Sequence, residues 1–311
     1  MLKQILVFGG HIQALGLARQ AHGLGLDVIL CVDDIHCVSR YSNCVSKIEC
    51  YKSLAQLCSI VDSYSSADKH CLLFPTNDEM VEFLSKHYDE YSQGFCVGIP
   101  NPDIVNLFND KRQAYQFAEN NKIAAPKCWY PDTMNDVENL STVLPYPVVV
   151  KPAVMYSFHK TFGKKAFKCS TKEELLSVYE RIYRSGYDIK MVLIQEFLDG
   201  GPKHLYSYAT FAVNGESQMY LMANRIRQNP MDFGNSTTFA VTCEIPEIKD
   251  SAEKILKLIG YFGLGEVEFM YDSNSGTYKF LEINTRAWKW HTLSNQLGFS
   301  FIGSMIKSAN I

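Results

Sequence analysis

The sequence predicts an α/β protein in which an N-terminal domain with a parallel sheet precedes two α+β lobes. Residues 1–98 alternate short apolar runs with amphipathic helices, the pattern of a parallel sheet covered on both faces. Residues 99–190 contain a buried apolar strand flanked by helices, and residues 191–311 contain further strands that end in a hairpin. The 311 residues, 47% of them hydrophobic, provide enough core for this division.

In the first domain, glycines follow the first expected strand. Gly9 and Gly10, with Gly16 beyond them and Asp33 and Asp34 after the second strand, suggest a dinucleotide site, although their spacing is not G-x-G-x-x-G. We favour the alternative of a tight turn into a helix whose N-terminus suits an anion. The expected elements are strands over residues 5–8, 28–32 and 71–74 and helices over residues 14–24 and 79–87.

The middle segment carries several lysines. An apolar strand over residues 148–150 ends in Lys151, which places a cation at the carboxyl end of a strand, where open α/β sheets bind ligands. A loop over residues 155–165 follows, and its Lys160, Lys164 and Lys165 are suited to closing over phosphates. A lysine at a strand end also snorkels without any function, and a charged loop can simply be exposed.

The C-terminal segment predicts a metal site. Two alternating strands over residues 265–270 and 280–286 flank a polar turn, and the alternation places Glu268, Glu282 and Asn284 on one face. Three oxygen ligands on one face suit Mg²⁺, which takes one or two carboxylates together with substrate phosphate oxygens. Arg286 extends this face and suits an anion. Read alone, the hairpin is equally well a solvated acidic surface.

Two other segments are candidates for ligand contacts. Arg225 and Arg227 alternate on an extended segment, so we expect them to share a face and, with Arg286, to bind carboxylate or phosphate groups. Residues 195–200 leave a strand into a loop, where backbone groups can pair with an adenine edge; an ordinary edge strand with a turn is the alternative. Lys111 opens a helix and, taken alone, reads as a solvated charge.

Charge and cysteine usage exclude some classes of partner. The net charge of −3 predicts neither nucleic-acid binding nor attachment to a membrane surface. The first residues lack the apolar core and cleavage site of a signal peptide, and no apolar stretch is long enough to cross a bilayer. The ten cysteines include no C-x-x-C pair, which favours reduced thiols in a cytoplasmic protein.

The order of these motifs resembles the ATP-grasp superfamily. Asn-Asp-Lys opens a helix at 109–111, a strand ends in Lys-Pro at 151–152, another ends in Gln-Glu-Phe-Leu at 195–198, and Glu-Ile-Asn-Thr-Arg stands at 282–286. The likeness runs from about residue 109 to the end, and residues 1–98 look like the domain that precedes it in such enzymes. Residues 39–42 resemble the carboxylate–amine ligase branch, which includes D-aspartate ligases and carbamoyl-phosphate-synthase-like proteins.

The resemblance implies a role for each candidate in binding ATP and Mg²⁺, with Mn²⁺ as an alternative metal. The ATP phosphates would be contacted by Lys111, Lys151 and one of Lys164 and Lys165. The adenine pocket would be lined by Glu196, Phe197 and Leu198, with Asp199 toward the ribose. The metal would be held by Glu268, Glu282 and Asn284. The acyl phosphate or substrate carboxylate would be held by Arg286 with Arg225 or Arg227.

The implied reaction joins a small-molecule carboxylate to an amine with release of ADP and phosphate, in a monomer or a homodimer. Residues 9–11, 76–78 and 234–238 are candidates to line the substrate site, beside the arginines. Two departures from the family pattern are the bulky residues in the 155–165 loop and a chain that ends 25 residues after Arg286, which favours a shortened or minimal form. The alternatives are an ATP-binding regulatory protein without ligase activity and a nicotinamide-dependent dehydrogenase built on the N-terminal glycines.

Overall fold

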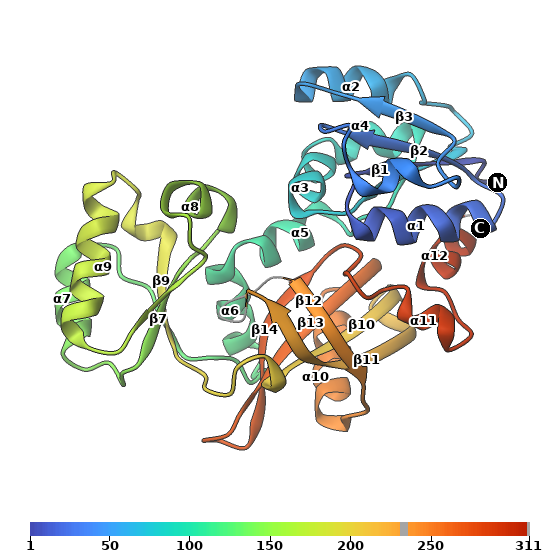
Figure 1. Cartoon of the computed structure of the whole chain (residues 1–311). Coiled ribbons are helices and arrows are strands. Elements are labelled where there is room, and N and C mark those ends of the chain that lie inside the picture. Colours follow the sequence, from blue (N-terminus) through green and yellow to red (C-terminus); the bar gives the residue numbers. More distant parts are fainter. Residues whose placement is uncertain (231–235, 310–311) are drawn as a thin grey trace.

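The chain folds around three sheets, shown in Figure 1. The computed structural model describes residues 1–230 and 236–309, without the side chains of residues 155–157 and 159. In the described residues, two five-stranded sheets and one four-stranded sheet follow one another along the chain. The mixed α/β class and the order of the parts agree with the prediction.

The first sheet is entirely parallel, in the order β3-β2-β1-β4-β5. Its central strand is buried on both faces: Ile5 and Val7 pack under α1, while Leu6 and Phe8 pack under α2, α3 and α4. The predicted covered sheet is therefore confirmed. The elements are β1 (Gln4–Phe8), α1 (Ile12–Gly23), β2 (Asp27–Val32), a 3₁₀ turn (Val38–Tyr41), β3 (Lys47–Cys50), α2 (Leu54–Asp62), β4 (Cys71–Pro75), α3 (Asp78–Lys86), α4 (Tyr88–Gly94) and β5 (Cys96–Val97).

The second sheet is antiparallel, in the order β6-β9-β7-β8, and carries three helices on one face. It forms the lobe at the left of Figure 1. Strand β9 belongs to this sheet, so the expected boundary at residue 191 is wrong and the lobe extends through Glu196. The elements are β6 (Cys128–Trp129), α7 (Met134–Ser141), β7 (Val148–Pro152), α8 (Met155–Phe162), β8 (Phe167–Cys169), α9 (Lys172–Arg184), a 3₁₀ turn (Ile189–Met191) and β9 (Val192–Glu196).

Helix α8 replaces most of the loop expected over residues 155–165. Phe158 and Phe162 are four residues apart and therefore lie on one face of a helix. Both are buried against Phe167 and Tyr187, with ring centroids 4.6–6.1 Å apart. Phe158 and Phe162, two of the bulky residues that made this segment unusual, are thus core residues, and residues 163–166 connect the helix to β8.

The third sheet is antiparallel, in the order β12-β11-β10-β13-β14, and is the last of the three along the chain. One face packs on α10 and on α5 and α6, which precede the second lobe in the sequence; the other face packs on the first domain and α12. The elements are α5 (Pro102–Asn109), α6 (Lys111–Asn120), a 3₁₀ turn (Pro202–His204), β10 (Leu205–Val213), β11 (Glu216–Asn229), β12 (Ser236–Thr242), α10 (Pro246–Leu258), β13 (Gly263–Asp272), β14 (Thr277–Asn284), α11 (Leu293–Gln296) and α12 (Phe301–Ala309).

Residues 102–120 therefore pack with the third sheet rather than with the lobe expected over residues 99–190. Phe108 contacts Phe280 of β14 edge-on, with centroids 6.2 Å apart. This packing carries the start of α6 to the third sheet. Among the described residues, we find no helix with the length and apolarity needed to cross a membrane.

Candidate functional site

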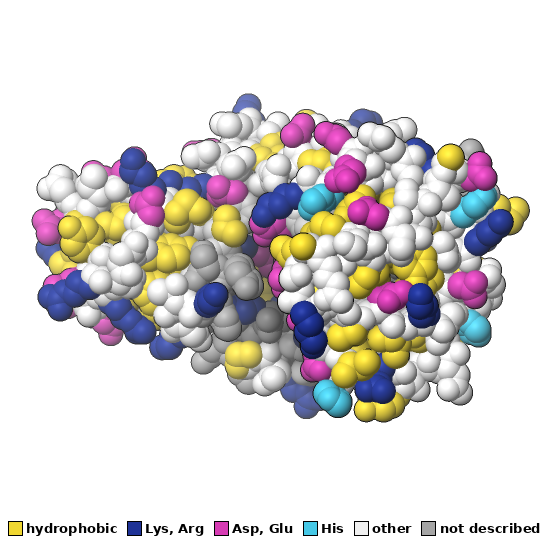
Figure 2. Space-filling model, turned by 90° about the horizontal axis from the view of Figure 1, so that it is seen from above, with side chains coloured by type: hydrophobic (Ala, Val, Ile, Leu, Met, Phe, Trp, Pro, Cys, Tyr) yellow, Lys and Arg dark blue, Asp and Glu magenta, His cyan; other side chains and the backbone are white. Residues whose placement is uncertain are grey.

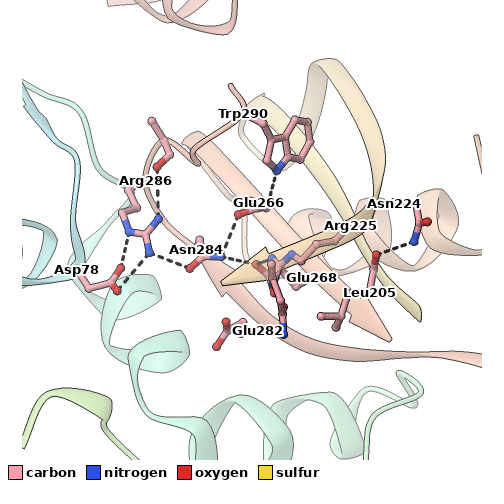
Figure 3. Close-up of polar contacts among 12 residues, drawn as sticks. Asp78, Leu205, Asn224, Arg225, Glu266, Glu268, Glu282, Asn284, Arg286 and Trp290 are labelled. Atoms are coloured by element: carbon pink, nitrogen blue, oxygen red, sulfur yellow. Dashed lines mark hydrogen bonds and ion pairs between the residues drawn. The ribbon is translucent and has the colours of Figure 1, made fainter. Parts of the chain in front are cut away.

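Four polar side chains share one face of the β13–β14 hairpin. The strands pair Glu266 with Asn284 and Glu268 with Glu282, so the predicted convergence of Glu268, Glu282 and Asn284 is confirmed. Glu266 was missed, although it lies two residues before Glu268 and the same alternation places it on this face. Its carboxylate accepts hydrogen bonds from Trp290 Nε1 at 3.2 Å and from Asn284 Nδ2 at 3.1 Å (Figure 3).

Each predicted metal-binding carboxylate is held by a cation. Arg225 Nη2 lies 2.7 Å from Glu268 Oε1, with both side chains about nine-tenths buried. Lys111 Nζ lies 2.6 Å from Glu282 Oε2. Lys111 is therefore not a solvated charge: α6 brings it to Glu282 on the hairpin, 171 residues away in sequence.

These charges shift one another's pKa values. Lys111 is the main cause that lowers the pKa of Glu282 to about 2. Burial, reinforced by the neighbouring Glu268, raises the pKa of Glu266 to about 7. The hairpin thus combines Glu282, which stays ionised, with Glu266, which gains or loses a proton near neutral pH.

The first domain contributes Asp78 to the site. Asp78 begins α3, and its carboxylate receives two hydrogen bonds from Arg286: from Nε at 2.5 Å and from Nη2 at 3.2 Å (Figure 3). Arg286 Nη2 also donates to Asn284 Oδ1 at 3.3 Å. Residues 76–78, a candidate for the substrate site, therefore do reach Arg286.

Two more lysines lie near Glu282. Burial lowers the pKa of Lys151 to about 8, and the like charge of Lys111 adds to this shift. Burial also lowers the pKa of Lys165, against the attraction of Glu282 and Asp78. Lys164 instead lies over the ring of Phe167, 5.5 Å from its centroid, so of the two loop lysines Lys165 faces the carboxylates.

The segment after β9 lies where the second lobe meets the third sheet. Glu196 accepts hydrogen bonds from Lys279 Nζ at 2.5 Å and from the backbone N–H of Lys127 at 2.8 Å. Its carboxylate therefore ties β9 to β14, a role that the sequence did not suggest. Lys168, also not predicted, places its ammonium 3.8 Å from the centroid of Phe197. Leu198 is buried, whereas Asp199 is exposed and caps the N–H of Gly200.

The two arginines of β11 do not share a face as predicted. A bulge interrupts the pairing of β11 with β12 between Arg225 and Arg227. Arg225 Nη1 contacts Gln228 at 3.4 Å, so Gln228 takes the place expected for Arg227. Arg227 is exposed and donates to Thr238 Oγ1 at 3.3 Å.

A further cation, Lys289, was missed. Its ammonium donates to Ser236 Oγ at 2.6 Å, and its pKa is lowered by burial and by the nearby Arg286 and Arg225. Gly234 and Asn235, in the candidate range 234–238, lie outside the described residues. Arg225, Arg286 and Lys289 together make this end of the site suitable for an anion.

The N-terminal glycines serve close packing. Gly9 has a φ of +104°, and a Cβ there would lie 2.5 Å from Thr76 Oγ1; a Cβ on Gly10 would lie 2.3 Å from Cys37 Cβ. The two turns that face the site therefore need glycine to approach each other. This geometry favours the tight turn over a dinucleotide motif.

The carboxylates suit a hard cation together with a polyphosphate. Within residues 1–230 and 236–309, no three His, Cys, Asp or Glu side chains form a metal cluster by themselves. Glu268, Glu282 and Asn284 supply two carboxylates and an amide oxygen, and the lysines beside them supply the charge for phosphates. This donor set fits Mg²⁺, which keeps water and phosphate oxygens among its ligands.

Comparison with known proteins decides the family. Residues 110–310 match the family model described as the carbamoyl-phosphate synthase L chain, ATP binding domain. The chain belongs to the ATP-grasp superfamily. ATP and Mg²⁺ are the cofactors of this superfamily. Membership assigns residues 110–310 to ATP binding. A dehydrogenase built on the N-terminal glycines would leave these residues without a role.

Two relatives by sequence are amino-acid ligases. This ATP-grasp chain is 27% identical to D-aspartate ligase of Enterococcus faecium over 230 residues, which cover 71% of this chain and 54% of that protein. It is 26% identical to D-alanine–D-alanine ligase B of Clostridium tetani, over 62% of this chain and 57% of that protein. The chain spans about half the length of these two relatives.

Solved ATP-grasp structures share the fold over the whole chain. The biotin carboxylase domain of Hydrogenobacter thermophilus 2-oxoglutarate carboxylase, solved with MgADP and bicarbonate, has a TM-score of 0.78 at 19% identity and covers 100% of this chain and 70% of that one. L-amino acid ligase from Bacillus licheniformis has a TM-score of 0.71 at 14% identity and covers 99% of this chain and 74% of that one. At these identities the likeness concerns the fold alone.

Proposed function

We propose that this protein is an ATP-dependent ligase that joins a carboxylate to an amine through an acyl phosphate. The observation that carries the proposal is the convergence of the Glu268–Glu282–Asn284 face with lysines on one side and arginines on the other. Figure 2 shows acidic and basic side chains gathered where the left-hand lobe meets the larger body. Membership in an ATP-binding family and similarity to two amino-acid ligases support the same reaction class.

The lysines form the nucleotide end of the proposed site. Lys111, Lys151 and Lys165 would bind the ATP phosphates, since all three are partly or fully removed from water beside Glu282. Glu268, Glu282 and Asn284 would hold Mg²⁺, which neutralises charge on the transferring phosphoryl group. The backbone of Glu196, Phe197 and Leu198 would face the adenine, and Asp199 would reach the ribose. Glu196's side chain is already committed to Lys279.

The arginines form the acid end. Arg286 is held by Asp78 and Asn284, so its guanidinium has a defined orientation. Arg225 is buried, and its Nε has no hydrogen-bond partner among the described residues, which leaves a donor for a ligand oxygen. Arg227 is a weaker candidate because the bulge turns it to solvent.

The proposed reaction has two steps. A carboxylate oxygen attacks the γ-phosphorus of ATP, the bond to the β-phosphate oxygen breaks, and ADP leaves. The amine nitrogen then attacks the acyl carbon, the bond to phosphate breaks, and the nitrogen loses a proton to water. The lysines and arginines stabilise charge that spreads over the phosphoryl group in the first step.

Release of ADP on addition of paired acids and amines tests the proposal. Glu282→Gln should lower ADP release by about 100-fold or more, the scale seen when one charge-stabilising group is removed. Glu180→Gln on α9 is the matched control, since Glu180 is exposed and its ion pair is with Arg184 one turn away. Normal amine-dependent ADP release by folded Glu282→Gln would refute the assignment.

The alternative is an ATP-binding regulatory protein without ligase activity. It predicts saturable binding of ATP with no ADP release for any acid–amine pair. A homodimer is a further proposal, supported by the dimeric H. thermophilus domain. Sedimentation velocity would test it.

A further inference from the structure

A large cleft adjoins the arginine end of the site. It has a volume of about 920 Å³ and lies between α1 of the first domain, β12, and residues 289–296. In Figure 1, α1 lies directly above the third sheet, with α11 beside it. The cleft is therefore built by parts of the chain that come together only in the folded protein.

One end of this cleft borders the site through two residues. Lys289 and Trp290 both line it. The indole of Trp290 binds Glu266 on the hairpin face, and the ammonium of Lys289 lies in the field of Arg225 and Arg286. A ligand in the cleft would thus have one end beside the cations that the reaction needs.

Lys289 differs from the two arginines in its described partners. Arg225 is paired with Glu268, and Arg286 with Asp78. In the described part of the chain, Lys289 has a hydroxyl partner, Ser236, but no acidic one. A half-buried ammonium without an acid is suited to a ligand carboxylate.

The walls of the cleft are largely apolar and partly open to water. Ile12 at the start of α1 and Leu24 just after its end are 56% and 47% exposed, and Phe239 on β12 is 51% exposed. Leu15, Ala240 and Leu293 add to this apolar lining, and the polar part of the wall includes Arg19, Gln20 and Gln296. Large apolar side chains that line one exposed concavity commonly mark a binding site rather than a random surface.

We propose that this cleft binds the apolar side chain of the carboxylate substrate, whose carboxyl group lies against Lys289 and the arginines. The inference rests on the proposed ligase function and adds the substrate class: an acid with an apolar group of at least the size of an aromatic ring. Its volume falls within the range of small-molecule pockets, which is far more than a methyl or carboxymethyl group needs.

Binding of two matched acids tests this assignment without catalysis. We would titrate 3-phenylpropionate and acetate into the full chain with Mg²⁺ and ADP present, by ligand-observed NMR. The ring-bearing acid should bind at least tenfold more tightly. Phe239→Ala should remove most of that preference, and Lys289→Met should weaken both acids. Val241→Ala is the control: it is 44% exposed on the same strand but does not line the cleft.

Equal binding of the two acids, or a preference that Phe239→Ala leaves intact, would overturn the assignment. So would sedimentation showing a dimer that Phe239→Ala dissociates, because a second copy would then cover the cleft. The ligase function is judged separately by ADP release. If the preference depends on Phe239 but no acid–amine pair releases ADP, the cleft assignment is supported and the ligase function is refuted. If ADP release is equal for the two acids, the ligase function is supported and the cleft assignment is refuted.

Discussion

Lys151 should strengthen nucleotide binding while lowering the free energy of unfolding of the free protein. Burial and Lys111 lower the pKa of its ammonium from 10.5 to about 8. Since one pKa unit is about 1.4 kcal/mol, holding this charge costs the free protein up to about 3 kcal/mol at pH 7. Lys151→Met keeps most of the volume and removes the charge, so we expect it to raise the free energy of unfolding by about 1–3 kcal/mol at pH 7.

The sign of the pH dependence makes the test specific. Between pH 8 and 10.5 the unfolded chain holds a proton on Lys151 that the folded chain has lost, so wild-type stability rises over this window. The advantage of Lys151→Met should be full below pH 8 and shrink by pH 9.5. Thermal and urea unfolding at pH 7 and 9.5 measure it, and calorimetry measures the weaker ATP binding expected of the variant. A variant that is no more stable than wild type at pH 7 refutes the reasoning.

Three further outcomes follow from the same contacts. Glu268→Gln leaves the buried Arg225 without its partner and should destabilise the fold by about 3–5 kcal/mol in urea unfolding; a loss below 1 kcal/mol would contradict a buried pair. Asp78→Asn frees Arg286 from its counter-charge and should change the KM for the acid while leaving the KM for ATP unchanged, as initial rates would show. Glu266, whose pKa is raised by burial, holds a proton in the folded state between pH 4.5 and about 7, so stability falls as pH rises through this window. Glu266→Gln should remove this fall, and an unchanged pH profile of unfolding would speak against it.

The shared face of Glu268, Glu282 and Asn284 was predictable because side chains alternate along a strand with a period of two. Once the two strands of the hairpin were recognised, alternation alone placed Glu268 opposite Glu282. The same rule places Glu266, two residues before Glu268, on this face. Arg227 was misplaced for the opposite reason: a bulge breaks the period, and nothing in the local sequence announces it.

Helix α8 and strand β9 show where local patterns fail in the fold. Phe158 and Phe162 carry a helical spacing, but one pair is too short a signal beside a glycine and three lysines. Strand β9 was assigned to the wrong lobe because its apolar residues fit either sheet, and only its pairing with β7 decides. The contact of Asp78 with Arg286 joins residues that are 208 apart in sequence. A local sequence pattern cannot predict a contact between residues so far apart.

The ion pairs of the site explain how it tolerates so many charges before a ligand binds. Lys111, a proposed phosphate ligand, is paired with Glu282, a proposed metal ligand. Arg225, a proposed ligand of the acid, is paired with Glu268 in the same way. Because MgATP brings both a cation and a polyanion, the Lys111–Glu282 pair can be exchanged for two external pairs, whereas Arg225 would exchange Glu268 for the carboxylate of the acid. A metal ion alone would leave Lys111 without its partner, and phosphate alone would leave Glu282 without its own. The arrangement therefore favours the metal–nucleotide complex over either component.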